Sequence, residues 1–195
     1  MHDSWVSGRR ASRGYRHGRG FSLVEMLVVT ALVACSAMAA APVLSAWHAR
    51  DRVDAAARAL LAGLTLARGE AIARGVRVVV CPALDGTRCL RKGRACAAGA
   101  FDWSCGWAVV PATRLPGQAL RTYRRNAGIS IVATPAHVEF TPPAGQIIGG
   151  FRNFEVVAAG AMLRGGSDAL RRCIRVAAGG RARLDRGRCD AAGNA

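Results

Sequence analysis

The sequence GFSLVEMLVVTALVACSAMAAAPVLSAW, residues 20–47, decides how this chain is organised. Between Phe21 and Trp47 the single formally charged residue is Glu25. A run of about 20 apolar residues is long enough to cross a bilayer as a helix. A carboxylate inside such a run is costly in lipid, so it requires a partner or a function. The stretch therefore predicts a membrane-spanning helix with one functional acid near its start.

The spacing of Gly20, Phe21 and Glu25, joined to this apolar run and followed by Pro42, resembles the class III signal of type IV pilins and type II secretion pseudopilins. In that family a prepilin peptidase cuts after the glycine and methylates the new N-terminus. The resemblance implies a cytoplasmic leader, residues 1–20, that is removed after Gly20 to leave an N-methylated Phe21. It also implies that Glu25 pairs with a neighbouring subunit's free amine during assembly, since opposite buried charges stabilise each other.

Two other interpretations of the same stretch stay open. The arginines before Gly20 could be the basic region of an ordinary secretory signal, and Ala37-Met38-Ala39 imitates its cleavage site. Glu25 would then lie inside the apolar region without a purpose. Alternatively, the stretch could be a plain membrane anchor that has no role in assembly.

The helix is expected to continue past Trp47, because the pattern becomes amphipathic rather than ending. Residues 21–47 are then the transmembrane and assembly half, and residues 48–74 are the amphipathic half. Pro42 is expected to kink the helix, and Gly75 is expected to end it. One face carries apolar residues at helical spacing: Val53, Ala56, Ala57, Leu60, Leu61, Leu64 and Ala67.

Residues 75–195 read as a β-rich domain, because the apolar period changes to two after Gly75. Short strands without helices between them imply antiparallel sheets. The fold class is therefore α+β, a long N-terminal helix followed by an antiparallel β-sheet domain. Residues 82–105 are expected to form a loop whose cysteines replace a core. The expected strands are 76–80, 107–110, 120–124, 129–133, 138–141, 154–158, 170–176 and 181–184.

The resemblance narrows to the GspH/FimT branch of pilin-like proteins over about the first 110 residues. The segments that carry it are Leu66–Gly75 with the strand Val76–Pro82, Asp85-Gly86-Thr87, and Gly106–Val110.

Six of the seven cysteines follow the apolar stretch, which favours disulfides in an oxidising compartment. We favour Cys173 with Cys189, and local pairs among Cys81, Cys89, Cys96 and Cys105. A zinc site is the alternative, although no CxxC motif is present. Cys35, inside the apolar helix, is expected to be a packed thiol.

The formal net charge is +16, and removing the leader, which carries +4, leaves +12. Such a charge favours a polyanion or an anionic membrane surface as partner. Arginines concentrate near the C-terminus, where they outnumber the acids, and arginine binds phosphate through a planar fork. The candidate DNA contacts are Gly180, Arg181, Arg183, Arg175, Arg186 and Arg188, with Arg114, Arg121, Arg124 and Arg125 as an extension.

Gly180-Arg181-Ala182-Arg183 also resembles the GRxR motif of FimT-type minor pilins, which bind DNA during natural transformation. This implies sequence-independent, salt-sensitive contact with double-stranded DNA. The alternatives are a solvated basic strand or a contact with another pilin. The cysteine-rich loop and the flanking Cys173 and Cys189 depart from the expected pattern.

No motif for an enzyme is present: there is no Walker loop, GxSxG or HExxH, and the histidines are scattered. We therefore expect no catalytic residue, metal or cofactor. The resemblance implies a minor pilin, single-pass in the inner membrane with a periplasmic C-terminal domain, which enters a filament of other pilins. The alternatives are a structural pseudopilin of type II secretion, and an anchored periplasmic binding protein that never polymerises.

Overall fold

The computed structural model describes residues 21–84, 89–90, 96, 101–112, 119–160 and 168–189. The predicted leader and Arg114 lie outside these residues. The chain divides into two compact units, Met1–Pro42 and Val43–Ala195. One helix, α1 (Leu23–Arg74), contributes residues to both units. It begins two residues later than predicted and ends at the predicted residue. Gly75, directly after it, has a φ of 63°, a left-handed conformation that suits glycine at a helix end.

In the first unit, the described helical side chains are exposed on every side. Leu23 and Val33 are 75% and 62% exposed, so the described residues leave most of each side chain uncovered. The hydroxyls of Thr30 and Ser36 donate to carbonyls one turn back, Met26 O at 2.9 Å and Leu32 O at 2.8 Å. They therefore need no water, and α1 is long and apolar enough to cross a membrane.

The expectation that Cys35 is a packed thiol is wrong for the isolated chain, because Cys35 is a free, exposed cysteine. Its burial would require atoms from outside this chain. The kink expected at Pro42 falls at the boundary between the units and stays a prediction.

In the second unit, the amphipathic half of α1 buries the predicted face. Its small members let the helix approach the sheets closely, and the larger ones fill the space between them. Leu61 is half-buried at the margin of this face. The fully covered residues are Val53, Ala56, Ala57, Leu60, Leu64, Ala67 and Ala71.

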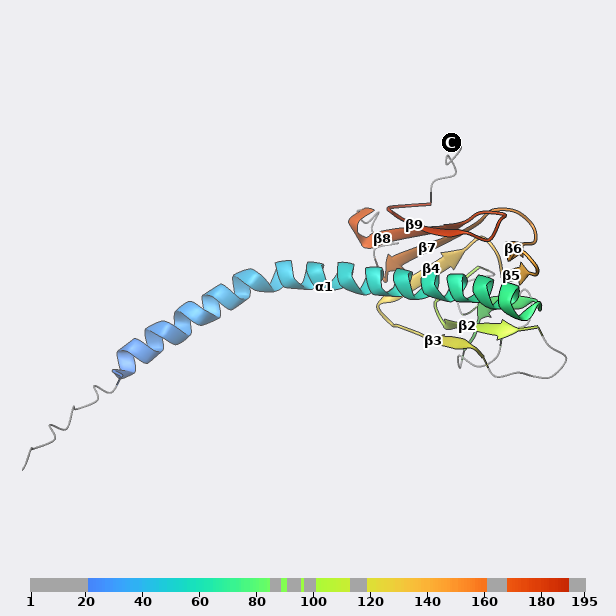
Figure 1. The fold of residues 1–195 in the computed structure, drawn as a ribbon. Helices are drawn as coiled ribbons and strands as arrows, with labels where there is room; N and C mark the ends of the chain where they lie inside the picture. The colour runs from blue at the N-terminus through green and yellow to red at the C-terminus, as the bar shows by residue number, and fades with distance from the viewer. Residues whose placement is uncertain are drawn as a thin grey trace, which may run out of the picture. The chain divides into compact units, whose positions relative to one another are not determined.

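The strands form two antiparallel sheets, as predicted. The first has the order β3-β2-β1-β5-β6 and the second β4-β7-β8-β9. Figure 1 shows β7, β8 and β9 on one side of the later part of α1, and β2 and β3 on the other. The bounds are β1 Val78–Pro82, β2 Gly106–Pro111, β3 Arg121–Arg124, β4 Ile129–Ala133, β5 Val138–Thr141, β6 Gln146–Ile147, β7 Arg152–Ala158, β8 Arg171–Val176 and β9 Ala182–Arg186.

Two differences from the expected strands have simple causes. The strand β6 was not predicted, because two residues after a turn are too short to show a period. Leu170 ends a 3-10 helix, η1 (Asp168–Leu170), instead of opening β8. Both of these differences lie next to turns, where a short segment shows no apolar period.

The expectation that cysteines replace the core in residues 82–105 is only partly right. Disulfides join Cys81 to Cys89 and Cys96 to Cys105. The same segment also delivers Trp103, which is fully buried, meets Phe154 edge-to-face at 4.9 Å and donates from Nε1 to Pro135 O at 3.0 Å. The loop therefore contributes one of the largest side chains of the core.

Gly63 lets a strand tryptophan pack directly on α1. A Cβ at Gly63 would lie 2.5 Å from two ring carbons of Trp107, which is fully buried and stacked on Tyr123. Protein cores tolerate such overlap poorly, because neighbours must leave their preferred rotamers. Gly63 is thus a packing residue, although in the sequence it reads only as a weak point of the helix.

We predict that Gly63→Ala lowers the free energy of unfolding by about 1–2 kcal/mol, because the ring of Trp107 must shift. The matched control is Gly69→Ala, where nothing lies within 4 Å. It should stabilise the same helix by up to about 1 kcal/mol through propensity alone. Urea titration of the full chain in detergent, followed by tryptophan fluorescence, measures both. Equal stabilisation by the two variants would contradict the packing role.

Candidate functional site

The first candidate region is the start of α1. Glu25 lies in the first turn of the helix, where a negative charge suits the helix dipole. It is exposed, and among the described residues no cation forms an ion pair with it. Phe21, the predicted first residue after cleavage, is 75% exposed. The described part of the chain therefore leaves the carboxylate available to a cation from elsewhere.

The second candidate region is the hairpin of β8 and β9. Arg175 lies opposite Arg183 in the register, and alternation places Arg181 on the same face. Arg181 and Arg183 are exposed, and Arg175 is partly so. Two acids share this face: Asp185, whose Oδ2 lies 3.6 Å from Nη1 of Arg175, and Glu155, which pairs with Arg171. We call Arg175, Arg181 and Arg183 the outer arginine row.

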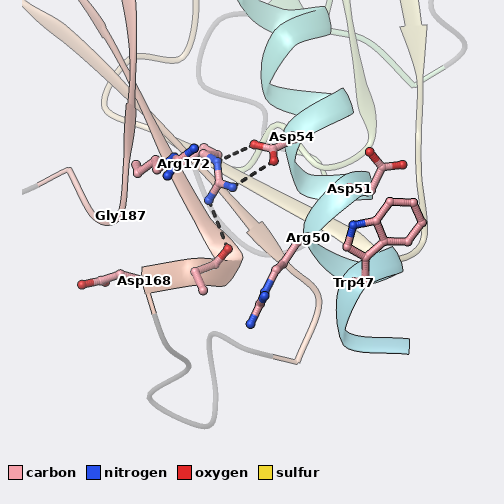
Figure 2. Close-up of a pocket in the computed structure, with 9 residues that line it drawn as sticks. Trp47, Arg50, Asp51, Asp54, Asp168, Arg172 and Gly187 are labelled. Atoms are coloured by element: carbon pink, nitrogen blue, oxygen red, sulfur yellow. Dashed lines mark hydrogen bonds and ion pairs between the residues drawn. The ribbon is translucent and has the colours of Figure 1, made fainter. Parts of the chain in front are cut away.

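Two neighbouring arginines of β8, Arg171 and Arg172, do not belong to this row. Arg171 and Arg172 are 6% and 7% exposed. Arg171 pairs with Glu155 across the sheet. Arg172 binds Asp54 of α1 through two contacts, Nε to Oδ1 at 2.5 Å and Nη2 to Oδ2 at 3.0 Å (Figure 2). These two cations hold the fold together and are not free to bind a polyanion.

The sequence pattern did not predict the Asp54–Arg172 pair, since its members are 118 positions apart. Arg172 also donates from Nη1 to the carbonyls of Ala169 at 3.1 Å and Arg171 at 2.6 Å. Its hydrogen-bonding capacity is therefore nearly saturated. The pair fixes α1 against β8, and a lone aspartate on an amphipathic helix gives no signal for this.

The assignment of Gly180 as a DNA contact is not supported by its surroundings. Gly180 is buried, has a φ of 77°, and donates from its amide to Ala177 O at 2.8 Å. A Cβ there would lie 1.9 Å from the carbonyl oxygen of Gly145. Glycine is therefore needed for the hairpin turn and for close approach to residue 145.

The remaining arginines separate into different surfaces. Arg186 lies opposite Arg172 in the register, so the two arginines are on the same face of the second sheet, the face that packs against α1. Arg188 is 3.9 Å from Asp168. Arg121 and Arg124 lie on β3, at the outer edge of the other sheet, and do not extend the outer arginine row. Of the predicted basic patch, the structure brings together Arg175, Arg181 and Arg183.

A disulfide joins Cys173 in the middle of β8 to Cys189 after β9, the pairing that the sequence favoured. Cys173 is fully buried, and the Sγ of Cys189 lies 3.4 Å from the carbonyl oxygen of Phe154. The link therefore fastens the chain after β9 to the outer face of the second sheet. The outer arginine row lies beside this covalent link rather than beneath it, since its arginines remain exposed.

A pocket of 590 Å³ lies between α1 and the second sheet, within the second unit (Figure 2). The Asp54–Arg172 pair forms part of its wall. Its other charged lining residues are Arg50, Asp51, Asp168 and Arg186, and Trp47 also lines it. Among the described residues no cluster of three metal-binding side chains occurs.

Comparison with known proteins gives two matching sequence families. A family described as the prokaryotic N-terminal methylation motif matches residues 15–41, which include Gly20, Phe21 and Glu25. A family described as type II transport protein GspH matches residues 56–180. A search of curated protein sequences found no significant match.

Solved structures with similar folds include the type IV minor pilin FimU of Pseudomonas aeruginosa. It is 20% identical, covers 70% of this chain and 90% of its own, and has a TM-score of 0.51. The minor pseudopilin EpsH of Vibrio cholerae is 12% identical over 69% of this chain and 94% of its own, with a TM-score of 0.41. The FimU likeness supports the pilin-like α+β fold. Because the second family match spans more than half of the sequence, the chain belongs to the family described as type II transport protein GspH.

Proposed function

We propose that this protein is a minor subunit of a type IV pilus-type filament. One observation carries the proposal: the first half of α1 is apolar and exposed on every side, and it is joined to a GspH-family domain. Such a helix needs an apolar environment that the described residues of its own chain do not supply. A membrane supplies it before assembly, and the helices of other subunits supply it in a filament.

The methylation motif supports processing by a prepilin peptidase between Gly20 and Phe21. After cleavage, the amine of Phe21 would lie close to the apolar stretch of a neighbouring subunit. Glu25 is the acid in that stretch, and it has no ion-pair partner among the described residues. Pairing between the two groups would make burial of each less unfavourable, so Glu25 would set the register between subunits.

Double-stranded DNA is the partner that we propose for the outer arginine row. Arg181 and Arg183 are exposed, and Arg175 is partly exposed and lies 3.6 Å from Asp185, so the guanidinium groups of the row are accessible to phosphates. Contacts of this kind carry no base readout, so binding would be independent of sequence and sensitive to salt. No aromatic residue belongs to the row, and base stacking has no part in the proposal.

The alternative is a structural pseudopilin of type II secretion, and the GspH description favours it directly. There the outer arginine row would contact another pseudopilin or a secreted protein. The two functions share the membrane helix, Glu25 and the processing step. They differ in the partner of the arginines, and DNA binding separates them.

We predict that Glu25→Ala leaves removal of the leader intact and strongly reduces incorporation into filaments. The buried amine of a neighbouring subunit would lose its countercharge. Immunoblotting of sheared filaments against the membrane fraction measures this. Glu70→Ala is the matched control, since Glu70 lies in the amphipathic half and pairs with Arg74. Normal incorporation of Glu25→Ala would refute the assembly role.

We predict that the full chain in detergent retards double-stranded DNA, and that Arg181→Gln/Arg183→Gln weakens the retardation. Loss of two phosphate contacts should reduce the slope of log K against log salt by about 2. Gel shifts across a salt series measure the slope. Arg121→Gln/Arg124→Gln, on the edge strand of the other sheet, removes the same charge and should have little effect. Equal losses in both variants would indicate a general charge effect and favour the pseudopilin alternative.

A further inference from the structure

The pocket between α1 and the second sheet is lined by charged side chains, and some of them form no ion pair among the described residues. Arg172 is neutralised by Asp54, and Asp168 lies 3.9 Å from Arg188. Arg50 and Arg186 also line the pocket and are exposed, and neither forms an ion pair among the described residues. The lining carries three arginines and three aspartates, and among the described residues Arg50 and Arg186 are the two of these arginines that form no ion pair.

The remaining acid of the lining, Asp51, does not offset these cations directly. In Figure 2, Asp51 lies beside Trp47, on the side of the helix away from Arg172, whereas Arg50 extends toward the space below Arg172. The part of the pocket near Arg50 is thus biased toward an anion. Two arginine forks can bind the oxygens of one phosphate group, each through parallel hydrogen bonds.

The place of this pocket along the chain indicates where the phosphate comes from. Counted along the sequence, residues 26–46 make about 30 Å of helix, the thickness of a bilayer's hydrocarbon core. Trp47 follows directly and is 58% exposed, and tryptophan is enriched at the boundary between acyl chains and headgroups. Arg50 comes about one turn later, at the depth of the headgroup phosphates.

We infer that Arg50 and Arg186 bind the phosphate of an anionic phospholipid headgroup while the subunit is in the membrane. This inference rests on the proposed function, because it requires that the first half of α1 spans the bilayer. Trp47 lies at the acyl boundary beneath the headgroup. The Asp54–Arg172 pair holds α1 and β8 at the spacing that brings Arg50 and Arg186 to one pocket. The bound lipid fixes the depth of the unassembled subunit.

Native mass spectrometry of the delipidated full chain in detergent tests the site. The probes are phosphatidylglycerol and phosphatidylcholine with identical acyl chains. Wild type should retain phosphatidylglycerol in preference. Arg50→Gln/Arg186→Gln should reduce its occupancy at least about tenfold, the scale of one charged hydrogen bond. Arg50→Lys/Arg186→Lys keeps the charge without the fork, and should lose part of the binding.

The matched control is Arg181→Gln/Arg183→Gln, which removes two exposed arginines from the outer row and should leave lipid binding unchanged. Equal retention of the two lipids by wild type would overturn the site, because both lipids carry a phosphate and the phosphatidylglycerol headgroup alone has a net negative charge. Weaker DNA retardation by Arg50→Gln/Arg186→Gln with unchanged lipid occupancy would also overturn it, in favour of a nucleic-acid contact. Carbonate extraction separates these results from the proposed function: failure of wild type to insert would contradict the membrane role itself.

Discussion

The rest of the structure depends on one constraint: the first half of α1 needs an apolar environment, and the second half of the same helix packs against the β-sheet domain. The first half of α1 is apolar around its whole circumference, and no described residue of its own chain covers it. The second half has one buried face, which includes Ala56 and Ala57, and Gly63 leaves room there for the ring of Trp107. The domain therefore stabilises the end of a helix whose beginning needs a membrane or other subunits.

The strongly basic composition is divided by the fold into cations with different roles. Arg171 and Arg172 are buried in pairs with Glu155 and Asp54, so they join elements that are distant in sequence. Breaking such a pair on one side leaves an uncompensated charge, which usually costs about 3–5 kcal/mol in a buried setting. The outer arginine row, in contrast, makes one ion pair among the described residues, between Arg175 and Asp185, and its other two arginines are exposed to solvent. A net charge of +16 therefore overstates the charge that a polyanion can contact.

The spacing of apolar residues, together with the positions of glycine and proline, predicted most of the helices and strands. The long helix, its end at Gly75 and the two-residue period of β4, β5 and β7 could be inferred, because local sequence determines them. The sheet order and Asp54–Arg172 could not, since they depend on contacts between distant residues. Gly180 shows the same limit at the candidate site: its motif suggested DNA contact, whereas its backbone conformation and the nearby Gly145 carbonyl explain its identity. Arg50 gave no signal at all, because its pocket forms only when β9 is placed beside α1.

The identity of the mature N-terminus tests the proposed function most directly, since the proposal requires cleavage between Gly20 and Phe21 before a subunit enters the filament. Intact-mass and N-terminal peptide mass spectrometry of the protein from the membrane fraction would measure it. The account predicts a chain that begins at Phe21 and carries one added methyl group on its amine. A chain that begins near residue 40, after Ala37-Met38-Ala39, would contradict the account and identify an ordinary secretory signal. A chain that keeps residues 1–20 would contradict it as well, and would leave a plain membrane anchor.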